Sequence, residues 1–183
     1  MKGKRLWQTF CLCLIPSATK RAAYLRRHGV FAGMGEDCLF MGRIVPLYPE
    51  LIRFGRNVSV ASKVTFVTHD VTHRVLNRSP RVRELLGEEA AGRKIAERKG
   101  CIEVGDDVFL GAGSLILPDV RIGSQVILGA GSVVTKDIPS GSVAAGVPAK
   151  VIGSFDEFAR KAASSARPAT AEELWAAFEE KRN

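Results

Sequence analysis

Aliphatic side chains recur at every sixth position between residues 104 and 138, and the rest of the chain is organised around this stretch. The members of this series are Val104, Leu110, Ile116, Ile122, Leu128 and Val134. Four residues after each of them comes a small or β-branched side chain: Val108, Ser114, Val120, Val126, Ser132 and Ile138. A period of six is neither the period of about 3.6 typical of a helix nor the simple alternation of a strand. It predicts a short extended segment followed by a corner, three of which close one triangular coil of a parallel β-helix. Both series should face the interior of the coil.

Glycine usually follows the aliphatic residue of each repeat, as at Gly105, Gly111, Gly123 and Gly129. Glycine adopts positive φ without a steric penalty. We therefore expect these glycines to form the corners of the coil.

The same rhythm is weaker in the first half of the chain and is interrupted twice. It begins at Met34 and Phe40, slips in the Pro-rich stretch 46–49, and resumes in a new register at Phe54, Val60 and Phe66. It stops at residues 68–70 and returns only at Val104, so residues 71–100 form a long loop insertion. A loop of this length in a compact domain is usually functional or disordered. We expect a flap over an acceptor site with a short helix at 82–86; the alternative is an idle surface excursion.

Helical patterns flank the repeats and give three segments: an N-terminal helical segment (1–29), a β-helix domain (30–153) and a C-terminal helical cap (154–183). Ser17 is the expected N-cap of a helix that stops at Gly29, and residues 170–173 form a capping-box pattern. The C-terminal helices are expected to cover the open end of the coil stack, where strand edges would otherwise aggregate.

Composition narrows the class of partner. The 183 residues carry a net charge of +8, with 46% hydrophobic and 7% aromatic residues, which suits a narrow coil filled by aliphatic side chains. No nucleic-acid-binding motif is present, so nucleic acid is not an expected partner and an anionic small molecule is the simpler one.

Residues 1–15 combine basic and apolar side chains; we expect a helix packed on the body, or alternatively a peripheral anchor at a membrane. Cys11, Cys13, Cys38 and Cys101 show no disulfide spacing and indicate the reducing cytoplasm, with the inner face of the membrane as the alternative location.

Three motifs carry a family resemblance. They are the two Leu-Gly-Ala-Gly-Ser segments at 110–114 and 128–132, the Val-Val-Thr-Lys-Asp-Ile-Pro segment at 133–139, and the Ala-Gly-Val-Pro-Ala-Lys segment at 145–150. Over roughly residues 20–153 the chain resembles the hexapeptide-repeat acetyltransferases, and in particular the maltose, galactoside and polysaccharide-modifying O-acetyltransferases. The resemblance implies a left-handed winding, acetyl-CoA as co-substrate, a saccharide acceptor and a homotrimer with the coenzyme between neighbouring subunits.

His69 is the candidate catalytic residue. Transfer of acetyl from a thioester to a hydroxyl needs a base, and an imidazole, with an ordinary pKa of about 6.5, can serve near neutral pH. The sequence Thr-His-Asp at 68–70 resembles the catalytic position of the family. Asp70 and His73 are candidate acceptor contacts, although Asp70 could equally cap a helical turn.

The coenzyme contacts follow from the resemblance, residue by residue. They are Phe109, Gly111, Ala112, Gly129, Ala130, Thr135, Lys136 and Lys150. Three positions depart from the family: Phe109 stands where tryptophan is common, Ala112 where serine is common, and Gly153 where an arginine is common.

Two other functions are consistent with the same fold. One is a non-catalytic β-helix scaffold. The other is a zinc hydratase like the γ-class carbonic anhydrases, for which His69 and His73 would supply two ligands. Because His28 lies outside the coils and no third ligand is evident, no metal site is expected.

Overall fold

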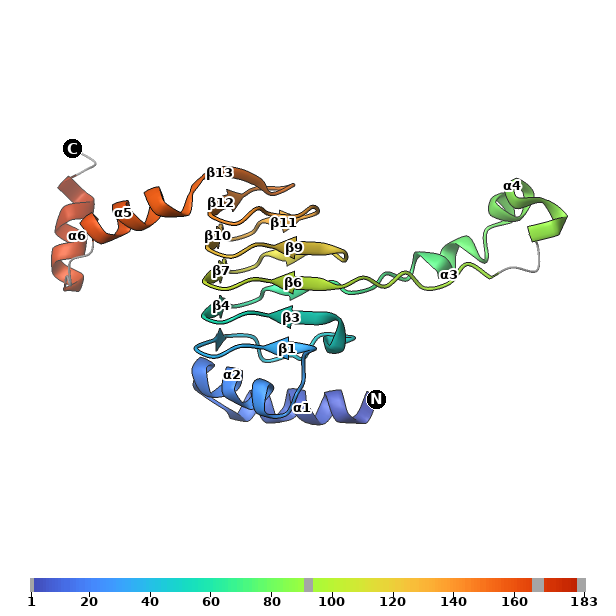
Figure 1. Cartoon of the computed structure of the whole chain (residues 1–183), viewed down its shortest axis with the longest axis horizontal. Coiled ribbons are helices and arrows are strands. Elements are labelled where there is room, and N and C mark those ends of the chain that lie inside the picture. The colour runs from blue at the N-terminus through green and yellow to red at the C-terminus, as the bar shows by residue number, and fades with distance from the viewer. Residues whose placement is uncertain (1, 91–93, 166–169, 181–183) are drawn as a thin grey trace.

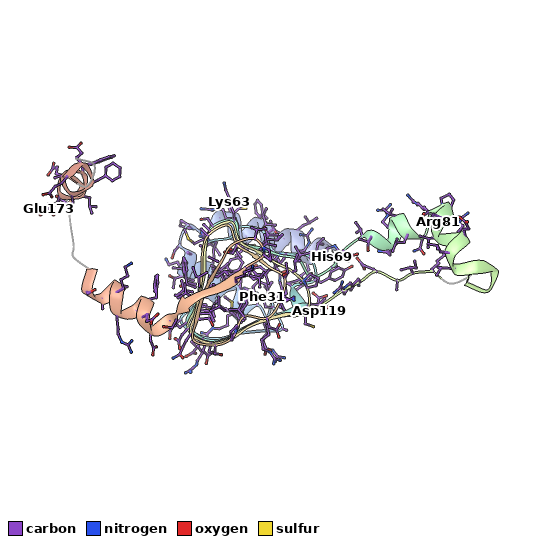
Figure 2. The ribbon with its side chains drawn as sticks, turned by 90° about the horizontal axis from the view of Figure 1, so that it is seen from above. Phe31, Lys63, His69, Arg81, Asp119 and Glu173 are labelled. Carbon is purple, nitrogen blue, oxygen red and sulfur yellow. The ribbon has the colours of Figure 1, made fainter. Side chains whose placement is uncertain are left out.

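The computed structural model describes residues 2–90, 94–165 and 170–180. Figure 1 shows a stack of flat coils with two helices at the end where the chain begins, a long arm leaving one side, and two helices extending from the other end.

Three parallel sheets form the sides of the stack, as the six-residue period predicts. The first has the strand order β1 (Gly33–Met34), β3 (Ile52–Phe54), β6 (Ile102–Val104) and β9 (Val120–Ile122). The second runs β2 (Leu39–Phe40), β4 (Val58–Val60), β7 (Val108–Leu110), β10 (Val126–Leu128) and β12 (Ser142–Ala145), and ends on the antiparallel strand β13 (Lys150–Ser154). The third, which we call the short sheet, contains β5 (Thr65–Phe66), β8 (Leu115–Ile116) and β11 (Val133–Val134).

The interior of the stack contains the side chains that the sequence predicts. The aliphatic series from Val104 to Val134 is at most 1% exposed, and the second series from Val108 to Ile138 is at most 5% exposed. Two serines of the second series bond to the backbone of their own corner, since Ser114 Oγ donates to the Gly111 carbonyl at 2.7 Å and Ser132 Oγ to the Gly129 carbonyl at 2.6 Å. A small polar side chain is therefore accommodated in the core because the corner supplies its acceptor.

The repeat glycines have a different physical role from the one predicted. Gly105 and Gly111 do not have positive φ, which is found instead at Asp107 (58°) and Gln125 (57°). A Cβ added to Gly111 would lie 2.5 Å from the Ala130 nitrogen of the next coil. These glycines are thus required because successive coils approach too closely for a side chain. The left-handed conformation falls instead on polar residues that tolerate it and on other glycines, such as Gly113 and Gly131.

The N-terminal helices are α1 (Lys2–Leu14) and α2 (Ala18–Arg27). As predicted, Ser17 caps α2 by accepting from the Lys20 amide at 3.4 Å, and Gly29 (φ 53°) follows its end. The 4% exposed Arg21 donates to the carbonyls of Ile15 and Phe40 at 2.6 and 3.0 Å, which joins the helix pair to the first coil.

The insertion forms an arm that points away from the coils of its own chain, so it is not a flap over them (Figure 1). It contains α3 (Thr72–Leu76) and α4 (Pro80–Ala90), and α4 includes the helix predicted at 82–86. The base of the arm is a short antiparallel pairing, in which His69 bridges Lys99 and the Gly100 amide donates to the Thr68 carbonyl at 2.9 Å.

The C-terminal helices α5 (Phe155–Ser165) and α6 (Ala171–Glu180) form, but they do not cover the end of the stack. The predicted capping box is present, with the Glu173 amide donating to Thr170 Oγ1 at 3.2 Å. Leu174, Trp175 and Phe178 are at least half exposed. Strand β13 instead pairs antiparallel with β12, so the edge strand of the second sheet at this end is β13. None of the helices within the described ranges combines the length and hydropathy needed to cross a bilayer.

Candidate active site

His69 stands where the chain leaves the short sheet and enters the arm. The Val67 amide still donates to the Ile116 carbonyl at 2.9 Å, and two residues later His69 pairs with Lys99. The Nδ1 atom of His69 is buried and has no hydrogen-bond partner among the described residues. Buried polar atoms of this kind normally have a partner, and an exception is often found at a catalytic or ligand-binding site.

Three residues that the sequence did not single out surround His69. The rings of Tyr48 and His69 lie 5.1 Å apart, centroid to centroid, in an edge-on arrangement at 78°. The Tyr48 hydroxyl donates to Glu97 Oε2 at 3.1 Å, and Lys99 Nζ lies 3.2 Å from the same carboxylate and 4.1 Å from the centroid of the Tyr48 ring. The group holds the imidazole between the loop before η1 (Pro49–Leu51) and the returning strand of the arm.

The charges of this group stabilise one another. Burial raises the pKa of the Glu97 carboxyl, but hydrogen bonds from Lys99 and Tyr48 outweigh burial and hold that pKa below its ordinary value. Hydrogen bonds with Tyr48 first and with Glu97 second raise the pKa of the Lys99 ammonium. Glu97 and Lys99 therefore remain an ion pair at neutral pH. The sequence contains one sign of this group, because the six-residue period slips at residues 46–49. In the structure Tyr48, within this stretch, has a left-handed backbone conformation (φ 50°).

The two predicted acceptor contacts lie next to His69 along the chain. The Asp70 carboxylate accepts from the Thr72 hydroxyl and the Thr72 amide at 2.5 and 3.0 Å, so it caps the turn that opens α3. These bonds lower the pKa of Asp70. His73 lies in α3, and its Nδ1 atom, like that of His69, is buried without a partner among the described residues.

A cavity of about 710 Å³ opens beside His69, along the first coils of the short sheet. Its size falls in the range of small-molecule sites, roughly 300–1,000 Å³. Basic side chains from separate segments line it, together with apolar ones: Arg5, Arg43 and Lys63 with Ile44, Leu47 and Val67. The cavity therefore suits a ligand with both apolar surface and negative charge.

Four of the eight predicted coenzyme contacts meet at one corner, where the second sheet turns into the short sheet. The Gly111–Ala112 and Gly129–Ala130 segments stack there, with the Gly111 amide donating to the Leu128 carbonyl at 2.9 Å and the Gly131 amide to the Ala112 carbonyl at 2.8 Å. Ala112 and Ala130 are exposed, so this column presents backbone and methyl groups to the outside. Such a surface can accept the close approach of a narrow chain of amides.

Two further predicted contacts flank this corner. Phe109 stands on the outer face of the second sheet, aligned with Ser59 and Ile127, and is 41% exposed. Lys150 begins β13 and pairs with Ala145, which lies directly over Gly129.

Thr135 and Lys136 lie at the opposite edge of the short sheet, on the same side as His69. The Leu117 amide donates to the Val134 carbonyl at 3.0 Å, which places Thr135 two layers above Val67. Strand spacing makes that separation roughly 10 Å. Within one chain, the glycine–alanine column and His69 are thus on different edges of the stack.

Metal ligation is not indicated by the described part of the chain. Within those residues no group of three or more His, Cys, Asp or Glu side chains is close enough to hold an ion. Cys11, Cys13, Cys38 and Cys101 are all free thiols.

Comparison with known proteins gives consistent matches. The family model described as bacterial transferase hexapeptide (six repeats) matches residues 102–136. A galactoside acetyltransferase in complex with coenzyme A is 27% identical, with a TM-score of 0.55 over 87% of this chain and 84% of the other. A maltose O-acetyltransferase from Clostridium difficile 630 shares the fold at 24% identity, with a TM-score of 0.51 over 82% of this chain and 85% of the other. No curated protein matches this chain. The parallel β-helix predicted from the repeats, with the left-handed winding that the resemblance implies, is therefore confirmed as the fold.

Proposed function

We propose that this chain, which matches the bacterial hexapeptide transferase model over residues 102–136 and is similar to a galactoside acetyltransferase, transfers the acetyl group of acetyl-CoA to a hydroxyl of a saccharide or other sugar-containing acceptor. The observation that carries this proposal is the position of His69, at the edge of a cavity and with a buried, unpartnered Nδ1 atom. The similarity to a galactoside acetyltransferase supports the choice of acceptor class.

In the proposed reaction His69 accepts the proton of the acceptor hydroxyl while the hydroxyl oxygen attacks the thioester carbonyl. The C–S bond then breaks, and the proton passes to the departing sulfur, so no acyl-enzyme forms. Tyr48 fixes the plane of the imidazole through its edge-on contact, and Glu97 and Lys99 hold Tyr48 in place. A backbone N–H would stabilise the charge that develops on the carbonyl oxygen.

The glycine–alanine column fits the elongated pantetheine arm of coenzyme A. Its exposed backbone can bond to the two amides of that arm, and an added side chain at Gly111 or Gly129 would collide with the neighbouring coil. Phe109 offers an apolar surface beside the column, and Lys150 offers a positive charge to the phosphates.

We further propose a homotrimer in which each site is shared between two chains. The column and His69 lie on different edges of one stack, so a neighbouring chain is the simplest source of the second half of the site. In this arrangement His69, Thr135 and Lys136 of one chain would face Ala130 and Lys150 of the next. Sedimentation velocity should then give three times the chain mass of 19.8 kDa.

The side chains that line the cavity indicate which acceptors it can bind. Arg5, Arg43 and Lys63 favour a saccharide that also carries a phosphate or carboxylate. Asp70 and His73, which follow His69 at the base of the arm, are proposed to contact the same acceptor. Free cysteines are consistent with the cytoplasm as the site of reaction.

The first test is release of free coenzyme A from acetyl-CoA in the presence of a panel of neutral, phosphorylated and amino sugars. His69→Ala should lower kcat by about 10²–10⁴-fold, with coenzyme A binding unchanged in calorimetry. His28→Ala is the matched control, since His28 is exposed and outside the site. Wild-type turnover by His69→Ala would remove the base assignment, and failure of the wild type to bind coenzyme A would favour the scaffold.

The shared site has a separate test. His69→Ala and Ala130→Arg should each be inactive, because the first loses the base and the second blocks the column. When the two variants are unfolded together and refolded, sites that pair the intact His69 of one chain with the intact Ala130 of another should restore activity. A mixture that stays inactive would show that each chain carries its site alone.

A further inference from the structure

The first helix is oriented with its polar side toward the protein and its apolar side outward. Its contacts with the body are made by the buried Leu12 and by polar groups: Arg5 Nη1 donates to the Val45 carbonyl at 3.0 Å, and Thr9 Oγ1 accepts from the Val45 amide at 3.2 Å. A surface helix of a globular protein normally shows the reverse arrangement.

The outward side of α1, which we call the apolar face, consists of Leu6, Trp7, Phe10 and Leu14. These side chains are 61%, 63%, 54% and 67% exposed, and the rings of Trp7 and Phe10 contact each other at 5.7 Å. Trp7, Phe10 and Leu14 follow one another at intervals of three and four residues, and Leu6 lies four residues before Phe10, which puts all four on one side of the helix. Because α1 forms the end of the molecule where the chain begins, this face has nothing of the described chain beyond it (Figure 1).

The charged side chains of the segment that carries the apolar face are of one sign. Residues 1–35 contain seven Lys and Arg and no Asp or Glu. Lys4 is exposed on α1, and Arg43 donates to the Cys13 carbonyl at 2.8 Å, so basic groups flank both ends of the face. Two copies of this chain joined through the same face would bring these positive charges together. A partner with an apolar interior and a negatively charged surface complements both the apolar face and the basic groups beside it.

We propose that α1 docks the protein on the surface of an anionic lipid bilayer. Leu6, Trp7, Phe10 and Leu14 enter the boundary between headgroups and acyl chains, the region in which tryptophan is enriched. The basic groups contact the anionic headgroups. Arg5 of the same helix lines the cavity beside His69, so docking holds that cavity close to the membrane surface.

Trp7 provides a direct readout. The chain has two tryptophans, so Trp175→Phe leaves Trp7 as the single tryptophan, which can be excited selectively over the tyrosines. With vesicles of phosphatidylcholine and phosphatidylglycerol in equal parts, its emission should shift to the blue, and the full-length protein should sediment with the vesicles. An unshifted spectrum or protein left in the supernatant would overturn the proposal.

Matched variants separate this face from other exposed aromatic groups. Trp7→Ser with Phe10→Ser should lower vesicle binding by roughly a hundredfold. Trp175→Ser with Phe178→Ser in α6, where the exposure is similar (64% and 50%), should leave binding unchanged. Lys4→Gln should weaken binding about fivefold to the anionic vesicles and not at all to phosphatidylcholine alone.

The same variants distinguish the bilayer from a second copy of the chain. Trp7→Ser with Phe10→Ser should have the oligomeric mass of the wild type in light scattering. A change in that mass would assign the apolar face to contact between protomers and overturn the proposal. Neither measurement uses a substrate, so both outcomes are independent of the acyltransferase assignment.

Discussion

Replacing Gly111 by alanine tests the physical reason for the repeat glycines. The added Cβ would lie 2.5 Å from the Ala130 nitrogen, 2.5 Å from the Leu128 carbonyl oxygen and 2.6 Å from the Gly129 carbonyl carbon. All three are backbone atoms, so no side chain can rotate out of the way. To regain ordinary contact the two coils must separate by roughly 1 Å, since carbon atoms pack at about 3.5–4.0 Å.

The cost follows from what this separation disturbs. The Gly111 amide bonds to the Leu128 carbonyl at 2.9 Å, and the Gly131 amide to the Ala112 carbonyl at 2.8 Å. Weakening two such bonds costs about 1 kcal/mol each, and overpacking adds about 1–3 kcal/mol. The free energy of unfolding should therefore fall by about 3–5 kcal/mol. Gly113 in the same corner is the matched control: its φ is 72° and a Cβ there has no neighbour within 4 Å, so alanine costs only the left-handed strain, about 1–2 kcal/mol.

Thermal unfolding at a fixed protein concentration measures both variants. For a chain of this size a change of 1 kcal/mol moves Tm by about 2–4 °C, so Gly111→Ala should lower Tm by roughly 6–20 °C and Gly113→Ala by no more than about 8 °C. If Gly113→Ala were the more destabilising of the two, backbone conformation and not close stacking would explain the repeat glycines.

Three further predictions concern the core, the ion pair and the coenzyme contact. Leu128→Ala removes a side chain that is 0% exposed and should cost about 2–5 kcal/mol of unfolding free energy in urea denaturation; a loss below 1 kcal/mol would contradict a close-packed interior. Because the pKa of Glu97 is lower in the folded than in the unfolded chain, its contribution to stability is present above the ordinary value of 4.5 and is lost as the pH falls below it; Glu97→Gln should flatten the acid limb of a stability–pH curve, and an unchanged curve would refute the ion pair. Lys150→Gln should weaken coenzyme A binding about two- to fivefold in calorimetry, whereas Lys20→Gln on the distant helix α2 should not, and equal effects would show a general charge effect only.

The interior side chains of the stack were predictable from the sequence because each coil needs side chains of the same volume at the same positions. Leu110 and Ile116 occupy equivalent places in one coil, so the same side-chain volume recurs at a fixed interval and leaves a readable period. The sequence predicted which repeat positions are glycine-dependent corners, but the prediction that these glycines have positive φ was wrong. The sequence shows that Gly111 lacks a side chain, whereas the reason lies in Ala130, a residue of the next coil.

Contacts between distant segments left no such signal. Tyr48 and Glu97 are forty-nine residues apart and meet only because the arm returns to the coil at the point where it left. Likewise, the amphipathic pattern of α6 predicted a helix correctly, but periodicity cannot say which surface the apolar side of a helix will meet. The predicted cover for the end of the stack was therefore wrong, since a backbone strand already occupies that edge.

The antiparallel direction of β13 has a consequence for how copies of the chain can associate. A second molecule laid end to end on this one would meet a strand of opposite polarity, and at the other extremity it would meet α2, which packs against the first coil. The second sheet therefore offers no parallel backbone template at the β13 extremity on which a fibre could elongate. End-to-end stacking that continues this sheet is thereby disfavoured.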